Sequence, residues 1–472
     1  MTGRVDLDVD KPIEDDEYML TAVPHSARRP TWKQVMVWVG FGYVVTGLFV
    51  GGVLAGFGGQ PGVSPGMALW AIGLGMGTLM ILTTLLGIMA QKTGLSLALI
   101  SRYSYGLLGS NIPLVVMALL TLGWFASITG MVGQIWASFI GNPSGITVLN
   151  PASLGYEGIP PITLENFLAC MVFGVVFTIT AYKGMKAIEA VAIPVAPIIL
   201  VIALIVGFGM LKEGGGLEAF LSEANKIDGL SLGSAITIVM GSWIAGVVMG
   251  VDLFRFNKSV KAVIVCAFAC FVLTNPLLNI VGYIGAVSVG QFNYVEWMVD
   301  KGIILAIIGV LAWTTSLWTT NNAELYCNSL YVGPVISSYD KKVDRRKIVL
   351  VVGVLGTIIG SLAFYQIFFA NFITILGAAF LPLAGPLIAD YFIVKKRKYD
   401  LDQLNSQPKY RLAGIISFII GAILGLTFEY GISSPFGLPS GFVALVITMI
   451  LYPIIYKVTN DGKFDKPTLQ RL

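Results

Sequence analysis

The sequence predicts an all-α integral membrane protein with twelve transmembrane helices. Its 472 residues are 56% hydrophobic and only 12% charged, with a mean hydropathy of +0.82, whereas a soluble domain carries about 25% charged residues. About a dozen apolar segments reach the roughly 20 residues that a spanning helix needs. Of the 30 Lys and Arg, all but Lys212, Lys226 and Lys301 fall in alternate gaps between these segments.

The alternating basic residues predict the topology, because Lys and Arg collect in the cytoplasmic loops of membrane proteins. Twelve spans satisfy the alternation and leave both termini in the cytoplasm. We predict spans at 34–57, 67–90, 112–139, 165–182, 187–211, 232–252, 260–288, 302–328, 348–368, 370–394, 412–430 and 438–456.

The chain is predicted to form one membrane domain, 33–458, between cytoplasmic tails at 1–32 and 459–472. Spans 1 and 6 enter the membrane from opposite sides, so two sets of five spans would be inverted copies, as in many transporters. This predicts one repeat at about 33–211, a second at about 231–394, and extra helices at about 411–458.

Glycines in the first span of each predicted repeat suggest a broken helix. Gly47 and Gly246 lie near the middle of spans 1 and 6, and glycine permits unwound backbone. Close helix packing through small residues is the alternative, and we prefer it for Gly73, Gly75 and Gly77 of span 2.

The composition argues against an enzyme or a nucleic-acid partner. His25 is the only histidine, so no Ser–His or HExxH constellation exists, and the four cysteines lie in apolar segments. The basic residues lie in short loops beside the bilayer, where they set topology. A channel would need a continuous polar pore, but the polar positions cluster at one depth. A transport-like sensor is a further alternative to a transporter.

Span 8 is the most polar segment, with the sequence WTTSLWTTNNAELYCN over 313–328. A carboxylate in mid-bilayer costs about 2.5–3.5 kcal/mol on insertion scales, so Glu324 is expected to face the bundle interior, towards the cytoplasmic end of the span. The hydroxyls of Ser316, Thr319 and Thr320 are hard oxygen ligands that suit sodium. Hydrogen bonding between helices is the alternative role of these residues.

Two tryptophans lie deep in predicted spans, Trp124 in span 3 and Trp243 in span 6. Aromatic rings at that depth can stack on a flat ring, which contributes about 1–3 kcal/mol per base in nucleic-acid complexes. Ordinary packing is the alternative.

The chain resembles the bacterial cytosine permeases of the nucleobase–cation symporter family. The matching stretches are VPHSARRP (23–30), QKTGLSLALISRYSYG (91–106), GWF (123–125), GSWIAGVVMGVDLFRF (241–256), LWTTNNAELY (317–326) and GAAFLPLAGPLIADYF (377–392). The resemblance implies a five-plus-five inverted-repeat fold of the leucine-transporter type with two extra helices. It also implies a planar nucleobase-like substrate, coupled to sodium or a proton.

The resemblance also implies roles for individual residues. Trp124 and Trp243 match the aromatic pair around the substrate ring, and Asn321 falls in the polar motif of span 8. The implied sodium ligands are main-chain carbonyls near Gly40 and Tyr43, the carbonyl of Ser316, and the hydroxyls of Thr319 and Thr320.

The departures from the family pattern concern hydrogen-bond partners of the substrate. Thr121 replaces a Gln and Ala245 replaces a Ser, while Ala323 and Glu324 depart from the span-8 pattern. A site built for hydrogen bonds rejects a ligand that leaves them unmade. This argues against cytosine itself and leaves a related purine, pyrimidine, allantoin, hydantoin or thiamine-precursor pyrimidine.

The sequence therefore predicts a secondary active importer of a flat heterocycle in the bacterial cytoplasmic membrane, driven by sodium. Trp124, Trp243, Asn321, Thr121, Ala245 and Glu324 are the expected substrate-binding residues. Proton coupling through Glu324 is the alternative. The expected partners are the small-molecule substrate and the lipid bilayer, and the oligomeric state stays open.

Overall fold

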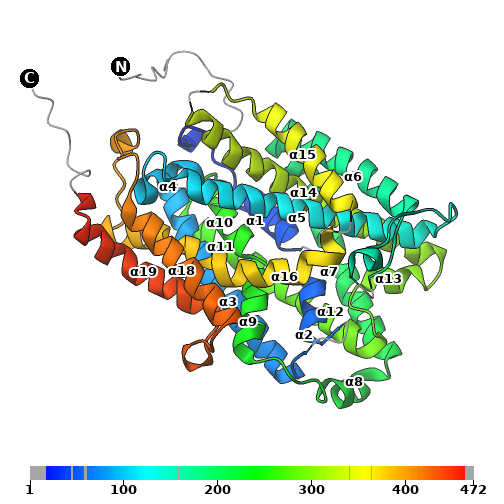
Figure 1. Cartoon of the computed structure of the whole chain (residues 1–472). Coiled ribbons are helices and arrows are strands. Elements are labelled where there is room, and N and C mark those ends of the chain that lie inside the picture. Colours follow the sequence, from blue (N-terminus) through cyan, green and yellow to red (C-terminus); the bar gives the residue numbers. More distant parts are fainter. Residues whose placement is uncertain are drawn as a thin grey trace, which may run out of the picture.

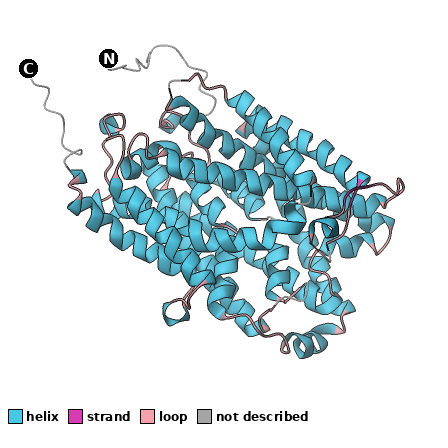
Figure 2. Cartoon of the chain, viewed as in Figure 1, coloured by secondary structure: helices cyan, strands magenta, loops and turns pink. Residues whose placement is uncertain are grey.

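The computed structural model describes residues 18–43, 46–57, 61–156, 159–339, 341–362 and 364–462. Most of this part of the chain is helical (Figure 2). One small antiparallel sheet pairs β1 (Thr147–Leu149) with β2 (Ile162–Thr163). Most of the two predicted tails lies outside the described residues.

The helices form a bundle of membrane spans joined by short connections (Figure 1). In chain order they are α1 (Thr31–Gly42), α2 (Thr46–Leu54), α3 (Pro65–Thr93), α4 (Leu97–Tyr105), α5 (Asn111–Ile140), α6 (Leu164–Lys183), α7 (Met185–Glu213), α8 (Gly216–Ala224), α9 (Leu232–Gly241), α10 (Ile244–Phe254), α11 (Val260–Phe268), α12 (Asn275–Val289), α13 (Tyr294–Val299), α14 (Ile303–Ser337), α15 (Arg345–Ser361), α16 (Phe364–Ile375), α17 (Ala384–Ile388), α18 (Leu412–Tyr430) and α19 (Ser440–Val458). Non-α helical turns join α11 to α12 (Ala269–Thr274), join α16 to α17 (376–383) and extend α17 (Ala389–Val394).

The number of spans agrees with the sequence. Within the described residues, nine helical runs are long and apolar enough to cross a membrane alone, and two bent pairs raise the number to eleven. The bent pairs are α1 with α2, and the second part of α7 with α8. α15, with 17 residues, occupies the place of the predicted ninth span. The prediction of an all-α membrane protein is confirmed.

The two halves of the bundle pack against each other reciprocally. α5 lies along α14 and α6 lies along α15, which are the third and fourth spans of each half. The first span of each half packs against the second span of the other: α1 and α2 against the α11–α12 span, and α9 and α10 against α3. Such exchanged partners are what an inverted repeat produces. α18 and α19 lie at one edge of the bundle (Figure 1).

The first span of each half is broken, but not at the predicted glycines. α1 and α2 meet at a 46° bend after Gly42, and α9 and α10 are separated by Ser242 and Trp243. Gly47 and Gly246 lie inside helices. A Cβ on Gly47 would lie 2.9 Å from Leu278 Cβ, and one on Gly246 would lie 2.6 Å from Cε3 of Trp243. These glycines therefore permit close packing, and the prediction of breaks at them was wrong.

The packing prediction for span 2 holds for one glycine of three. A Cβ on Gly75 would lie 2.6 Å from Val239 Cγ1, so α3 approaches α9 closely at this point. Gly73 and Gly77 have no atom within 4 Å of such a Cβ. For these two positions the prediction was wrong, because they lie on another face of α3.

Two predicted boundaries also differ. α14 continues to Ser337, nine residues beyond the predicted end of span 8 at 328, so Glu324 lies well inside the helix rather than near its end. The ninth span ends at Ser361 and α16 begins at Phe364, within the region that the sequence assigned to span 9.

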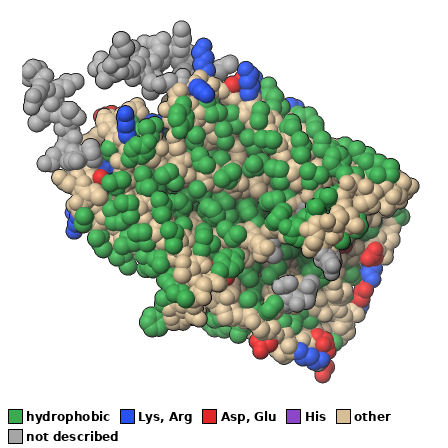
Figure 3. All heavy atoms as spheres, viewed as in Figure 1, with side chains coloured by type: hydrophobic (Ala, Val, Ile, Leu, Met, Phe, Trp, Pro, Cys, Tyr) green, Lys and Arg blue, Asp and Glu red, His purple; other side chains and the backbone are tan. Residues whose placement is uncertain are grey.

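Charged residues divide between the two ends of the bundle. The surface in Figure 3 has a wide apolar zone with Lys and Arg gathered at one end, near α4 and 395–411, which we call the basic end. Asp and Glu gather at the opposite end, near α8 and α13. This polarity follows from the alternation of basic loops along the chain.

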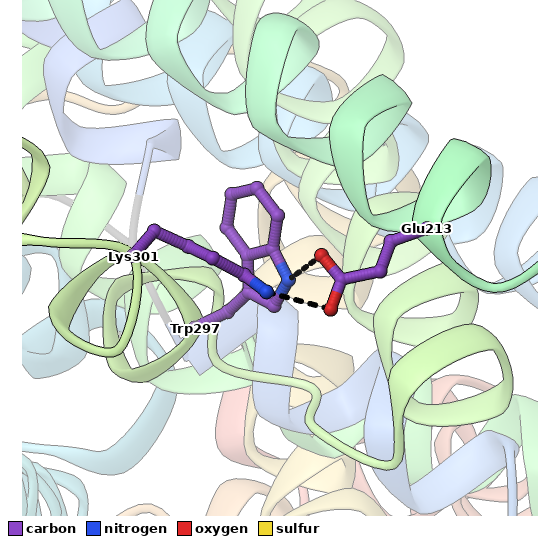
Figure 4. Close-up of polar contacts among 3 residues, drawn as sticks. All are labelled: Glu213, Trp297 and Lys301. Carbon is purple, nitrogen blue, oxygen red and sulfur yellow. Dashed lines mark hydrogen bonds and ion pairs between the residues drawn. The ribbon is translucent and has the colours of Figure 1, made fainter.

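Two of the three lysines that break the alternation of basic gaps lie at this acidic end, each beside a glutamate. Lys226 Nζ lies 2.7 Å from Glu223 Oε1, and Lys301 Nζ lies 2.7 Å from Glu213 Oε1. Figure 4 shows Glu213, the last residue of α7, also accepting a hydrogen bond from Trp297 Nε1 of α13 at 3.0 Å. Exposed ion pairs contribute only about 0–1 kcal/mol, so this cluster positions α13 beside α7 rather than stabilising the fold.

The crossing of α2 and α12 provides a test of the packing. A Cβ on Gly51 would collide with the Asn279 carbonyl oxygen, and one on Gly282 with that of Leu48. We expect Gly51→Ala and Gly282→Ala to destabilise the protein by about 1–3 kcal/mol, because overpacking forces the backbones apart. Gly73→Ala is the matched control, expected to change stability by no more than about 0.5 kcal/mol. Thermal unfolding in detergent measures both, and equal melting temperatures would contradict the close crossing.

Candidate functional site

A small cavity lies where the two broken spans meet α5 and α14. Its free space, about 10 Å³ for the centre of a water-sized sphere, holds about one water molecule, so a ring-sized ligand needs the walls to move apart. Its lining residues are Phe41, Thr46, Trp124, Ser242, Trp243, Gly246, Thr320 and Glu324.

The helix breaks supply most of the lining. Phe41 belongs to the last turn of α1 and Thr46 begins α2, so the break in span 1 lies between them. Ser242 and Trp243 form the break between α9 and α10, and Gly246 follows in the first turn of α10. Where a membrane helix unwinds, its backbone and neighbouring side chains can face a central cavity.

Trp124 and Trp243 both line the cavity, as the sequence predicted, and each is held by its own aromatic neighbours. Trp243 contacts Phe41 edge to face, with ring centroids 4.9 Å apart, and Phe271 at 5.5 Å. Trp124 contacts Phe369 in the same way at 5.4 Å. Such pairs contribute about 0.5–1.5 kcal/mol each beyond area burial, so the two indoles are fixed before any ligand binds.

Three polar groups that line the cavity are left without partners. Within the described part of the chain, Trp243 Nε1, Thr320 Oγ1 and Glu324 Oε2 are buried and form no hydrogen bond. Buried polar atoms are almost always paired, and each unpaired one costs about 1–3 kcal/mol. Unpaired atoms that share a cavity therefore mark it as a place for a polar ligand.

Three of the residues predicted to hold sodium, Tyr43, Ser316 and Thr319, lie together at the break of span 1, while Thr320 lines the cavity. Ser316 Oγ of α14 donates a hydrogen bond to the Tyr43 carbonyl at 2.9 Å, and Thr319 Oγ1 donates to the Ser316 carbonyl at 2.7 Å. Gly40 is buried three residues before Tyr43. The donor set is entirely oxygen, which fits a hard cation. The described residues contain no cluster of three or more His, Cys, Asp or Glu.

Asn321 is buried near the cavity, but its amide is used between helices. Its Nδ2 donates to the Phe125 carbonyl at 3.3 Å and to Thr129 Oγ1 at 3.1 Å. Its Oδ1 has no partner among the described residues. Asn321 therefore joins α14 to α5, and only one of its polar atoms is left for a ligand.

Thr121 and Ala245, the other two predicted substrate residues, lie outside the cavity lining. Thr121 Oγ1 donates to the Met117 carbonyl at 2.8 Å and accepts from Asn328 Nδ2 at 2.9 Å. Ala245 is buried in the first turn of α10. The structure thus gives Thr121 a role in the contact between α5 and α14.

Sequence reasoning missed Phe41, Thr46 and Ser242 as lining residues. Phe41 and Thr46 lie beside the break of span 1, and Ser242 is part of the break between α9 and α10. The signal was available in principle, because residues beside a break face the space that it opens. It could not be used while the breaks were assigned to Gly47 and Gly246.

Two carboxylates at the basic end, Asp252 and Asp390, have partners within the bundle. Asp252 accepts a hydrogen bond from the main chain at the start of α4 at 3.1 Å, and Arg255 Nε donates to the Asp252 carbonyl at 3.1 Å. Asp390 accepts hydrogen bonds from Tyr399 at 2.7 Å and Tyr452 at 2.8 Å. Neither carboxylate lines the cavity.

Comparison with known proteins places the chain among transporters. A family model described as permease for cytosine/purines, uracil, thiamine, allantoin matches residues 22–446. The cytosine permease of Escherichia coli K12 is 26% identical over 415 residues, which cover 87% of this chain and 89% of that protein. The allantoin permease of Bacillus subtilis is 24% identical over 482 residues, covering 95% of each. The hydantoin permease of Microbacterium maritypicum is 27% identical over 346 residues, covering 70% of this chain and 66% of that protein.

Solved structures share the fold. Mhp1, a nucleobase-cation-symport-1 family transporter in a closed conformation with bromovinylhydantoin bound, has a TM-score of 0.75 at 20% identity, covering 95% of this chain and 99% of that one. Its inward-facing conformation has a TM-score of 0.71 at 21% identity, covering 94% and 97%. A Na+-coupled sialic acid symporter has a TM-score of 0.61 at 12% identity, covering 97% and 94%.

The interhelical role of Asn321 can be tested without a ligand. We expect Asn321→Ala to destabilise the protein by about 1–3 kcal/mol, because its partners on α5 lose a buried donor. Combined with Thr129→Val, the loss should be smaller than the sum of the two single losses, since both act on one contact. Thermal unfolding of the ligand-free protein measures this, with exposed Asn142→Ala as the control. An unchanged melting temperature for Asn321→Ala would contradict the assignment.

Proposed function

Because the chain belongs to the family of permeases for cytosine/purines, uracil, thiamine and allantoin, we propose that it imports a small planar heterocycle by sodium-coupled symport. Family membership makes it a transporter rather than an enzyme, as the sequence predicted. The observation that carries the proposal is the cavity between the two helix breaks, which combines two fixed indoles with unpaired polar atoms.

The lining favours a flat ring as substrate. Trp124 and Trp243 offer π-faces, and stacking of a base on an aromatic side chain contributes about 1–3 kcal/mol. The relatives include cytosine, hydantoin and allantoin permeases. The substrate is accordingly a nucleobase or a related compound such as a hydantoin, allantoin or a thiamine-precursor pyrimidine.

The break of span 1 provides a physical route for coupling. Its Tyr43 carbonyl is bonded to Ser316, while Phe41 and Thr46 on its two sides line the substrate cavity. Sodium bound to the oxygens of Tyr43, Ser316 and Thr319 would replace the hydrogen bonds among them and fix the backbone at the break. Since that backbone carries part of the cavity wall, each ligand would raise the affinity for the other, as linkage requires.

The orientation follows from charge. We place the basic end in the cytoplasm, with both chain ends on that side and α8 and α13 outside, because basic loops are retained there. In this orientation, movements of span 5 (α7) and of the irregular tenth span would open the cavity to either side. Pro382 lies in the 3₁₀ turn Leu381–Leu383 and Pro386 lies inside α17, and prolines are common sites of helix kinks.

Sodium coupling is tested by ligand-dependent stability. A panel of nucleobases, hydantoins, allantoin and hydroxymethylpyrimidine should contain a compound that raises the melting temperature in NaCl and not in choline chloride. A ligand at 100 times its Kd stabilises by about 2.7 kcal/mol. We expect Thr319→Val to remove the sodium dependence, whereas Thr315→Val, whose hydroxyl bonds only within α14, should retain it.

The outcomes separate the parts of this proposal. Equal stabilisation in both salts would reject sodium coupling and leave a heterocyclic substrate as the proposal. Absence of any stabilising compound in the panel would reject the substrate class.

A proton-coupled mechanism is the second candidate, favoured by Glu324. This carboxyl group is buried in the lining, and no Lys, Arg or His is among the lining residues to pair with it. If it carries the coupled proton, Glu324→Gln should abolish uptake driven by an inward proton gradient and leave substrate exchange intact. Glu429→Gln, at the far end of α18, is the control. Uptake by Glu324→Gln that still follows the proton gradient would reject this candidate.

A further inference from the structure

We propose that Glu324 selects heterocycles that present two adjacent N–H donors on one edge, such as a ring N–H beside an exocyclic amino group. This inference rests on the proposed function and adds the substrate class. It predicts that 2-amino-4-oxopyrimidines and guanine-type rings bind, and that uracil- and hydantoin-type rings are rejected.

The position of Glu324 is the first step. Its side chain is 4% exposed and lines the cavity together with Trp124 and Trp243. Oε2 forms no hydrogen bond within the described part of the chain. Every other residue of the lining is aromatic, hydroxylic or glycine. The ligand must therefore supply what this carboxylate lacks.

The chemistry of a carboxylate defines the complementary edge. An ionised carboxylate only accepts hydrogen bonds, through both oxygens, and binds most strongly to a pair of parallel donors. An edge of adjacent N–H groups satisfies this requirement. Uracil and hydantoin have no two adjacent N–H groups: N3–H lies between two carbonyl groups, and N1–H lies between a carbonyl and a C–H. Only one carboxylate oxygen would therefore receive an N–H donor.

Two further unpaired atoms complete the pattern. Trp243 Nε1 can only donate, and Thr320 Oγ1 can donate or accept. A carbonyl oxygen on another edge of the same ring would satisfy the indole N–H. The lining thus complements a planar ring with a donor–donor edge and a separate acceptor, which is the arrangement in 2-amino-4-oxopyrimidine (isocytosine).

Isocytosine and uracil form a matched pair for the test, since they differ by one amino group in place of an oxo group; guanine and xanthine form a second pair. Kd values are measured by calorimetry on the detergent-purified full chain in NaCl. We expect isocytosine to bind about 10- to 150-fold more tightly than uracil, the range for one hydrogen bond to a charged group.

Glu324→Gln separates recognition from folding. The amide has nearly the same shape but offers one donor and one acceptor, so the variant should lose the preference for isocytosine or reverse it towards uracil. Its melting temperature should not fall, because the amide keeps the shape of the carboxyl group and Oε2 forms no hydrogen bond that would be lost. Glu429→Gln, the same change in a carboxyl group outside the cavity, should keep the preference of the parent protein.

The failures are distinguishable. Suppose that heterocycles bind but uracil and isocytosine have equal Kd values, or that Glu324→Gln keeps the parent protein's ratio of these Kd values. Then the proposed selection by Glu324 is wrong, and the transporter proposal stands. If no compound of either pair or of the wider panel binds, the substrate class fails and this inference fails with it.

Discussion

The structure depends on one constraint: a helix that unwinds inside a membrane must have its backbone hydrogen bonds satisfied by other groups. Span 1 meets this requirement with side chains from two other spans. Asn275 of α12 donates to the Gly42 carbonyl at 3.2 Å, and Ser316 of α14 donates to the Tyr43 carbonyl at 2.9 Å. Both acceptors lie at the end of α1, so the break is stable only while α12 and α14 stay beside it. The packing of the first half against the second is therefore a condition for the break.

The same constraint explains why the cavity lies where it does. Each break releases one side of a helix from regular packing, and the two breaks are brought together by the reciprocal contacts of the halves. Glycines then allow the aromatic side chains around the cavity to pack closely against neighbouring helices. Gly246 leaves room for the Trp243 ring against α10, and Gly123, beside Trp124, does the same for Phe372. Small residues in this bundle shape the aromatic lining more than they break helices.

The sequence predicted the features that depend on composition and order, and missed those that depend on rotation of a helix about its axis. Apolar length and basic loops were sufficient for the spans, and two deep tryptophans and Glu324 do line the cavity. The break positions were missed because glycine serves unwinding and packing equally well. Asn321 was assigned to the substrate because it falls in the polar motif of span 8, and the structure shows that its amide group donates to α5.

The polar residues of α14 fall into two groups: those that form hydrogen bonds with neighbouring helices, and those with a polar atom that forms none. Asn321 and Asn328 donate to α5, and Asn322 lies 2.6 Å from the Thr180 hydroxyl of α6. These amides act as interhelical contacts, a common use of polar residues in membranes. Thr320 and Glu324 project from the same helix, yet the described residues offer no partner to Thr320 Oγ1 or Glu324 Oε2. A polar group that the bundle leaves unpaired at this cost persists only if something else pairs with it, and under the proposed function that partner is the transported molecule.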